Sequence, residues 1–553
     1  MKSKIFAGLI ICIFFLPICA FGATYFVAEK AAGLGDGSSY ANRMNVATHN
    51  SFSFVPGDTI YLCDIINSMV DVPSSGTKDK RIVYRGDYSG HKVLIDINKP
   101  MERNAYGFRV MNQDYIMIEA LTITEAGNGI VIQTGSDFIS VVKSEIYDCG
   151  ERGIFISNWQ AKCTNIVIGG SAANANIIRD CGSSTASADI ISGSNKNITV
   201  SYNHLYATRK DRGIGGIWMV ETDGFLIERN SIHDHNKSTT GDLGEGGISC
   251  KSASNGIIRY NHIYKHTLSG DEAGIRTSGN SHDIRIYGNI IHDNNIGIHP
   301  NDAYIRSDGC GDGISQYNIY IFNNLIYRNE SYGIVLSYNG HCTPVEFSPD
   351  TLKNIFIFNN VIAENGYHPR FGDDGTGLTI RDRVDNVQIR NNIFYKNRPD
   401  EPLINKRYHV STVDSSNIML QNNQYYWPGI SGKAIFSWAG SSLTLAEIKA
   451  QKHENDLPAG TESDPGFTDP GNHKYTLLAD SVCRNSGFNL GSNFADAIDP
   501  DITKVSEFPL SIETLKHPAQ GFWARGAYSY NKTQPSQAKL NPPLNLRPRK
   551  EGD

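Results

Sequence analysis

The fold is decided by the stretch Ile198-Thr199-Val200-Ser201-Tyr202-Asn203-His204-Leu205, in which apolar and other residues alternate before an Asn. Apolar residues two positions apart indicate a strand, because successive side chains of a strand point to opposite faces. The same phrase returns at steps of 27 to 36 residues, which indicates stacked supersecondary units. Its asparagines are Asn203, Asn230, Asn261, Asn289, Asn324, Asn360, Asn392 and Asn423.

A second strand in each repeat is introduced by Gly-Ile, as at Gly247-Ile248 and Gly274-Ile275, with Gly377-Leu378 as a variant. Several short strands per repeat, with no room for a long helix, predict an all-β fold, a right-handed parallel β-helix solenoid. Stacked coils would let the repeated Asn side chains bond to one another as a ladder. A β-propeller is the alternative, but its blades need about 40 to 50 residues.

The chain divides into five parts. Residues 1–22 are predicted to be a signal peptide, because Lys2 and Lys4 precede a short apolar run and then small residues. Residues 23–100 are assigned to an N-terminal cap and first rungs, and residues 101–427 to the β-helix with its Asn ladder. Residues 428–530 form a closing segment, with a short helix expected within 443–453. Residues 531–553 are a polar tail that we expect to be disordered.

The composition favours a folded, soluble protein rather than a disordered one, the predicted signal peptide indicates export, and we expect a monomer. Charged residues are 20% and apolar residues 40%, and the net charge is −6. An acidic total gives no indication of nucleic-acid binding, and no later stretch is apolar enough to span a membrane. We expect a secreted, periplasmic or cell-surface location, with anchoring left open.

Eight cysteines remain after the signal peptide, and none has the spacing of a zinc site. Cys149 and Cys181 both occur in Asp-Cys-Gly at like positions of neighbouring repeats, and Cys310 and Cys342 lie in consecutive long loops. Each pair could form a disulfide in an exported protein, or stay as buried free thiols.

These features together resemble the secreted bacterial right-handed parallel β-helix proteins of the pectate-lyase-like superfamily. The Asn repeats carry the resemblance, with Pro56-Gly57-Asp58-Thr59 at the start and Gly526-Ala527-Tyr528 at the end. Proteins of this kind mostly degrade, modify or bind acidic polysaccharides, so an acidic polysaccharide is the implied partner. Fold alone does not fix the activity.

A shorter segment is similar to polysaccharide lyase family six, which contains alginate lyases and a chondroitinase. The segment is Glu245-Gly246-Gly247-Ile248-Ser249-Cys250-Lys251-Ser252, followed by Asn255, Asn261 and Gly274-Ile275-Arg276. By this resemblance Lys251 is the catalytic base and Arg276 works with it one rung on. The resemblance also implies a calcium-binding acidic site, for which Glu245 is the matching residue and Asp242 a second carboxylate. Calcium is the only cofactor expected.

Strand alternation predicts which side chains meet. Ile248, Cys250, Ile275 and Thr277 should point inward, so Ser249, Lys251 and Arg276 point outward. By the same count Trp218 precedes them on an exposed outer groove, and His299 and Asn301 follow. We expect Lys251, Arg276 and His299 to be catalytic, and Trp218, Ser249 and Asn301 to bind substrate.

This set suits β-elimination from a uronic acid. A guanidinium or calcium ion would neutralise the sugar carboxylate, and an amine whose pKa is lowered by a neighbouring cation would take the adjacent proton. Trp218 would stack on a sugar, and His299 would protonate the leaving oxygen.

Other functions stay open. A non-catalytic carbohydrate-binding or surface protein would use the same face without chemistry, and a uronate epimerase would use similar bases. A glycoside hydrolase would need paired carboxylates, for which Gly372-Asp373-Asp374 or Glu245 with Asp242 are the candidates.

Overall fold

The structure is a computed structural model of the whole chain, and its described residues begin at Gly22 and end at Tyr530. They are 22–158, 160–183, 187–209, 211–235, 246–267, 273–302, 316–338, 352–368, 375–381, 383–398, 408–413, 417–429, 432–451, 460–501, 503–505, 508 and 510–530. Residues 1–21 of the predicted signal peptide, the tail, Glu245, Asp242, Cys310, Cys342 and Asp373-Asp374 lie outside the described residues.

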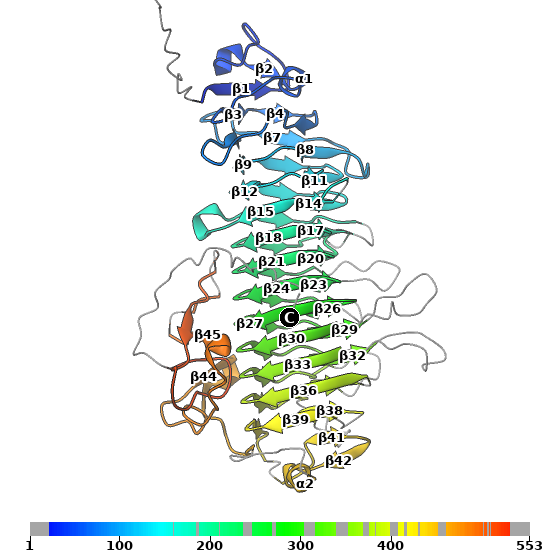
Figure 1. Cartoon of the computed structure of the whole chain (residues 1–553), viewed down its shortest axis with the longest axis vertical. Helices are drawn as coiled ribbons and strands as arrows, with labels where there is room; N and C mark the ends of the chain where they lie inside the picture. Colours follow the sequence, from blue (N-terminus) through cyan, green and yellow to red (C-terminus); the bar gives the residue numbers. More distant parts are fainter. Residues whose placement is uncertain are drawn as a thin grey trace, which may run out of the picture.

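The first sheet runs along one side of an elongated solenoid (Figure 1). All its strand pairs are parallel, and strands separated by roughly one repeat in sequence are neighbours in space. In sheet order its strands are β2 (Met44–Asn45), β1 (Thr24–Ala28), β3 (Thr59–Leu62), β6 (Ile82–Arg85), β9 (Ile116–Glu119), β12 (Ser140–Val142), β15 (Thr164–Gly169), β18 (Lys196–Ser201), β21 (Asp223–Glu228), β24 (Ser254–Arg259), β27 (His282–Tyr287), β30 (Gln316–Phe322), β33 (Leu352–Phe358), β36 (Val384–Arg390) and β39 (Ile418–Gln421).

The second sheet is made of shorter parallel strands that follow the repeated Asn. Its strands are β4 (Ile65–Ile66), β7 (Leu94–Asp96), β10 (Thr122–Thr124), β13 (Glu145–Tyr147), β16 (Ile177–Arg179), β19 (His204–Tyr206), β22 (Ser231–His233), β25 (His262–Tyr264), β28 (Ile290–His292), β31 (Leu325–Tyr327), β34 (Val361–Ala363), β37 (Ile393–Tyr395) and β40 (Gln424–Tyr426).

The third sheet contains the Gly-Ile strands, and only its last pair, β41 with β42, is antiparallel. Its strands are β5 (Val70–Asp71), β8 (Tyr106–Met111), β11 (Asn128–Gln133), β14 (Arg152–Ser157), β17 (Ala188–Gly193), β20 (Gly215–Val220), β23 (Gly246–Lys251), β26 (Ala273–Ser278), β29 (Ile296–Asp302), β32 (Tyr332–Tyr338), β35 (Thr376–Ile380), β38 (Val410–Thr412), β41 (Phe436–Trp438) and β42 (Ser441–Leu443). The predicted all-β solenoid of stacked parallel coils is therefore confirmed.

The repeated asparagines form the predicted ladder at the corner between the first and second sheets. The side-chain Oδ1 of Asn324 accepts hydrogen bonds from the backbone N–H and the Nδ2 of Asn289, each at 3.0 Å. Asn289 accepts the same two bonds from Asn261, again at 3.0 Å. Because each Asn bonds both neighbours, the ladder fixes the register of successive coils.

A second ladder that the sequence reasoning missed lies inside the corner between the second and third sheets. Asn294, Asn329, Asn365 and Asn397 are each fully buried, and the Nδ2 of each of the first three donates to the Oδ1 of the next at 2.8 to 3.0 Å. His266 extends this ladder, because its Nδ1 lies 2.7 Å from the Oδ1 of Asn294. The coil corners are thus held by two internal rows of polar side chains.

Cys149 and Cys181 follow β13 and β16, which are paired strands of the second sheet, so the two cysteines occupy equivalent positions of neighbouring coils. Both are buried, and both are free thiols rather than a disulfide. Of the two alternatives for this pair, the structure has the free thiols. Burial raises the pKa of Cys181 far above its usual range.

The ends of the solenoid are closed differently. The N-terminal end carries the 3-10 helix η1 (Tyr40–Asn42) and the helix α1 (Val46–His49), while α2 (Leu445–Ala450) follows the third sheet and confirms the expected short helix. The C-terminal segment then folds back beside the coils (Figure 1), with antiparallel pairs β43 (Phe467–Asp469) with β44 (Lys474–Leu477) and β45 (Asp496–Ile498) with β46 (Thr514–Lys516). Short 3-10 helices complete the described elements: η2 (Ala172–Asn174), η4 (Pro470–Asn472) and η5 (Ser492–Phe494).

The C-terminal segment covers an aromatic outer surface of the coils. Tyr475, Ile498 and Tyr528 of the segment pack in one cluster with Tyr287 and Phe322 of the first sheet. Among the described residues, no helix is long and apolar enough to cross a membrane.

Candidate functional site

The candidate site lies on the outer face of the third sheet, where β20, β23, β26, β29, β32 and β35 are successive neighbours. Ile217, Ile248, Ile275 and Ile298 have no exposed surface and belong to the central core, so the residue after each of them points outward. The strand register places those residues in one row: Trp218, Ser249, Arg276 and His299.

A second outward row lies two residues further along the same strands. It contains Val220, Lys251, Ser278, Asn301 and Ser337. Lys251 is therefore not level with Arg276 but diagonal to it on the neighbouring strand. Strand spacing and rise put their Cα atoms about 8 Å apart, which is within reach of two long side chains on one face.

Trp218 is buried, with 8% of its surface exposed, so the expectation of an exposed tryptophan was wrong. Its ring packs in a cluster with Ala188, Ile191 and Ile214. The indole also lies back over its own strand. Its Nε1 atom is 2.6 Å from the position that a Cβ on Gly215 would take, so the glycine makes room for the ring. Side-chain direction was predicted from alternation, but alternation carries no information on what covers the outer face.

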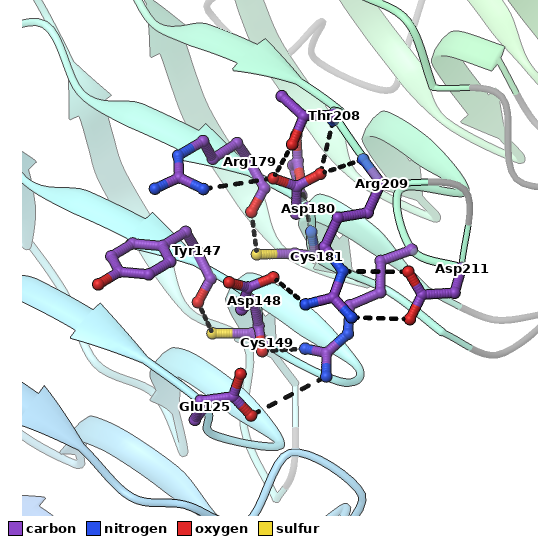
Figure 2. Close-up of polar contacts among 12 residues, drawn as sticks. Glu125, Tyr147, Asp148, Cys149, Arg179, Asp180, Cys181, Thr208, Arg209 and Asp211 are labelled. Atoms are coloured by element: carbon purple, nitrogen blue, oxygen red, sulfur yellow. Dashed lines mark hydrogen bonds and ion pairs between the residues drawn. The ribbon is translucent and has the colours of Figure 1, made fainter.

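The segment that delivers Ile214 to Trp218 is held by an ionic network shown in Figure 2. The Asp180 carboxylate accepts hydrogen bonds from the backbone N–H groups of Thr208 (2.6 Å) and Arg209 (2.9 Å). The Arg209 guanidinium in turn bonds the Asp148 carboxylate at 3.0 Å. This network ties the turn between β19 and β20 to the preceding coils, and so supports the apolar part of the outer face.

Several buried polar atoms on this face have no hydrogen-bond partner among the described residues. Within the described residues, Trp218 Nε1, Arg276 Nε, His299 Nδ1 and both amide atoms of Asn301 are buried and make no hydrogen bond. Each such atom costs about 1–3 kcal/mol relative to a satisfied one. Unpartnered groups gathered on adjacent strands are typical of a site that receives its partners from a ligand or from ordered water.

His299 is 3% exposed, and its Nε2 lies 2.8 Å from the Ser337 Oγ. Burial lowers the pKa of His299 well below its usual value, and the positive charges of Arg276 and Arg381 lower it further. The imidazole is therefore neutral at neutral pH. This state disagrees with the expected role of His299 as the acid that protonates a leaving oxygen, and it favours a role as hydrogen-bonding group or base.

Arg381 is a residue that the sequence reasoning missed. It directly follows β35, where its backbone N–H donates to Leu336 O at 2.9 Å and brings it level with Ser337. The signal was present, because Leu378 and Ile380 point inward in the variant Gly-Leu strand and Arg381 continues the outward alternation.

The expected calcium ligands, Glu245 and Asp242, lie outside the described residues, so calcium binding stays a prediction. In the part of the chain that the structure describes, no group of three or more His, Cys, Asp or Glu side chains could hold a metal ion.

Comparisons with known proteins agree with the fold. Residues 210–347 match a family described as "Right handed beta helix region". No curated protein matches the chain in sequence.

Solved structures with similar folds include an alginate lyase from Paenibacillus sp. str. FPU-7, which is 15% identical with a TM-score of 0.36, over 61% of this chain and 95% of that chain. A mannuronic acid specific polysaccharide family 6 lyase from human gut microbiota is 14% identical with a TM-score of 0.39, over 82% of this chain and 94% of that chain. The Dettilon tailspike protein is 12% identical with a TM-score of 0.42, over 66% of each chain. At these values the similarity gives no information about activity. The stacked parallel coils, together with the match over residues 210–347, show that the chain has the fold of a right-handed parallel β-helix.

Proposed function

We propose that this protein cleaves a uronate-containing polysaccharide by β-elimination on the outer face of the third sheet. The observation that carries the proposal is the placement of Lys251 and Arg276 on one face of neighbouring strands, beside polar atoms that have no partner within the described chain. A polymer is a reasonable ligand for such a face, because successive coils can contact successive sugars.

The chemistry needs three groups. Arg276 is only 9% exposed, so its guanidinium would pair with a sugar carboxylate in a poorly hydrated environment where the ion pair is strong. This pairing makes the carbon-bound proton beside the carboxylate more acidic. Lys251 in its neutral form would take that proton as base.

Elimination then balances as follows. The C–H bond breaks as Lys251 takes the proton, a carbon–carbon double bond forms in the ring, and the glycosidic C–O bond breaks. The leaving oxygen must receive a proton, which the lysine ammonium or water can supply. His299 would hold the substrate as a neutral hydrogen-bonding group.

Arg381 would share the carboxylate-binding role. In the third sheet, β29 with His299 lies between β26, which carries Arg276, and β35, which Arg381 follows, and both charges act on His299. Two cations flanking a neutral imidazole suit an anionic ligand. Arg381→Gln should therefore raise KM more than it lowers kcat, whereas Arg276→Gln should lower both.

The test is incubation with alginate, pectate and chondroitin, followed by the ultraviolet absorbance of unsaturated sugar ends. Lys251→Ala should abolish the signal, while Lys196→Ala, which changes a lysine on the first sheet, should leave it unchanged. Circular dichroism would establish that both variants are folded. A Lys251→Ala protein that is as active as wild type would disprove the assignment.

Two further measurements on the same polymers separate the alternatives. Binding to a polymer with no product on a broad panel would support a non-catalytic carbohydrate-binding protein. Inverted uronate residues without chain cleavage, detected by proton NMR, would indicate an epimerase.

A further inference from the structure

The second ladder lacks its own residue in one coil. A residue of this ladder lies five positions after the repeated Asn of its coil, as His235 does after Asn230. The residue five positions after Asn203 is Thr208, which is exposed and donates its hydroxyl proton to the Asp180 carboxylate at 2.9 Å (Figure 2). The side chain that the ladder needs at this level must therefore come from another strand.

Asp189 of β17 fills the gap from the third sheet. It takes the place of the glycine in a Gly-Ile pair, because Ile190 pairs with Ile217 of the next strand. A side chain at this position points at the ladder, since a Cβ on Gly247 would lie 3.2 Å from the His266 ring. Asp189 has no exposed surface, so a carboxyl group stands inside the solenoid.

The neighbouring asparagine fixes the direction of the hydrogen bonds in the ladder. Asn294 Oδ1 accepts from the backbone N–H of His266 at 3.3 Å, and its Nδ2 donates to Ile263 O at 3.3 Å. His266 Nδ1 lies 2.7 Å from the same Oδ1, so Nδ1 carries a proton. A neutral imidazole has only one N–H, and His266 Nε2 is therefore an acceptor.

The same reasoning applies to His235. Its Nδ1 lies 3.3 Å from His266 Nε2, and the two rings are parallel within 2° with centroids 5.5 Å apart, so they lie edge to edge. His235 donates its Nδ1–H across this contact, which leaves a lone pair on its Nε2 when the ring is neutral. That Nε2 is 2.8 Å from Asp189 Oδ2. Two lone pairs repel at this distance, so one further proton lies between His235 and Asp189.

Burial decides which group holds that proton. Neither side chain has exposed surface, and a charged form of either one is costly there. Burial raises the pKa of Asp189 well above its usual value and lowers the pKa of His235 to about 3. A neutral acid beside a neutral imidazole is the arrangement that both shifts favour. The titratable groups that act on the pair from neighbouring segments are Asp180, Cys181, His233, Asp234 and His266.

We propose that Asp189 is a neutral carboxylic acid that donates its proton to His235, and that this buried proton is a pH-sensitive lock on the coil between β17 and β20. Above about pH 6.5 the unfolded chain holds no proton on either group, whereas the folded chain holds one. Each further pH unit therefore lowers the folding equilibrium constant about tenfold through this pair. Between about pH 4 and 6.5 both states hold one proton, so the pair adds no slope there.

The lock supports one part of the outer face without belonging to it. Ile191, two residues after Asp189 on the same strand, packs against Trp218 of β20. Loss of the buried proton should loosen this contact from below. The lock stands whether or not the protein is a lyase, because Asp189 and His235 are inside the coils.

The test is urea unfolding of the full chain from pH 5 to pH 8, for wild type, Asp189→Asn and the control Asp223→Asn. An amide N–H can replace the acid proton in the bond to His235, so Asp189→Asn keeps the lock closed at every pH. The ratio of its folding equilibrium constant to that of wild type should rise about tenfold per pH unit. Asp223 is partly exposed, pairs with Lys196 at 3.2 Å and is ionised in both states, so the control ratio should stay constant. At pH 8, amide exchange in β17 and β20 should be slower in Asp189→Asn than in wild type.

Infrared spectra of the chain labelled with carbon-13 aspartate locate the proton. Wild type at pH 7 should show the carbonyl stretch of a protonated carboxylic acid, and Asp189→Asn should lack it. A constant stability ratio for Asp189→Asn from pH 5 to pH 8 would overturn the buried proton. Absence of the acid band in wild type would overturn its placement on Asp189 and assign it to a His235 imidazolium. If Asp189→Asn does not fold, the wild-type spectrum decides alone.

Discussion

Replacing Asn289 by Ala should destabilise the centre of the solenoid by about 3–5 kcal/mol. Asn289 Nδ2 donates to Ile258 O at 3.0 Å and to Asn324 Oδ1 at 3.0 Å, and its Oδ1 accepts from the Asn261 backbone N–H and Nδ2 at 3.0 Å. The substitution removes all of these bonds. It also leaves the Asn261 N–H buried with no acceptor, because that N–H has no other recorded bond in the described chain.

The magnitude follows from these contacts. A typical hydrogen bond contributes about 1 kcal/mol net, and a buried donor left unsatisfied costs about 1–3 kcal/mol. The ladder bonds are fully buried, so water cannot replace the lost acceptor. The loss should appear as a lower urea midpoint followed by circular dichroism, and as faster amide hydrogen exchange in β24 and β27.

Asn386→Gly is the matched control. Asn386 is exposed, its Nδ2 donates to Asn354 Oδ1 at 2.8 Å on the outside of the coils, and its φ of 52° is one that glycine adopts freely. This variant should change stability by less than about 0.5 kcal/mol. If Asn289→Ala is no less stable than Asn386→Gly, the first Asn ladder, which contains Asn289, does not hold the coils together.

Further predictions concern pH, thiols and the outer face. Burial lowers the pKa of His409 to about 3, so below about pH 6.5 the unfolded chain binds a proton on this residue that the folded chain does not. The free energy of unfolding should therefore fall as the pH decreases from 6.5 towards 3, by up to about 4 kcal/mol for this residue. His409→Leu should flatten the plot of unfolding midpoint against pH. Cys149 and Cys181 should give unlinked peptides in a non-reducing digest and resist alkylation until the protein unfolds, and a linked peptide would contradict the free thiols. Asn301→Leu should raise the free energy of unfolding by about 1–3 kcal/mol, because it removes two unpartnered buried atoms, and it should weaken polymer binding. A destabilised variant would mean that the amide is satisfied.

The strands and the Asn ladder could be predicted because their signal is local. Ile198 and Val200 alternate within one strand, and an Asn recurs at the same position of each coil from Asn203 to Asn423, so the pattern is visible in the sequence. The second ladder, at the corner between the second and third sheets, was missed, because the same structural position is occupied by His266 in one coil and by Asn294 in the next. A position that exchanges residue types has no repeating letter to find.

For the candidate site, the sequence could predict which side chains point outward but not how far they are buried. Alternation placed Arg276 and Lys251 outward, and the register agrees. Burial of Trp218 was not predictable, since it depends on Ile191 of the preceding coil and Ile214 of a turn. Contacts between coils are not written in any one strand, so exposure on the outer face has to come from the structure.

The Asn ladder and the outer face of the third sheet differ in how their buried amide groups are satisfied. Inside the coils, Asn289 and Asn329 have their amide groups bonded on both sides of the ladder. On the outer face of the third sheet, Asn301 is just as buried, yet both of its amide atoms are unpartnered. Asn289 and Asn329 lie at coil corners with their side chains inside the solenoid, whereas Asn301 lies in β29 with its side chain on the outer face. A fold that satisfies the amides of its inner ladders can tolerate a few kcal/mol of unsatisfied groups outside, and under the proposed function those groups are the ones that the anionic polymer would meet.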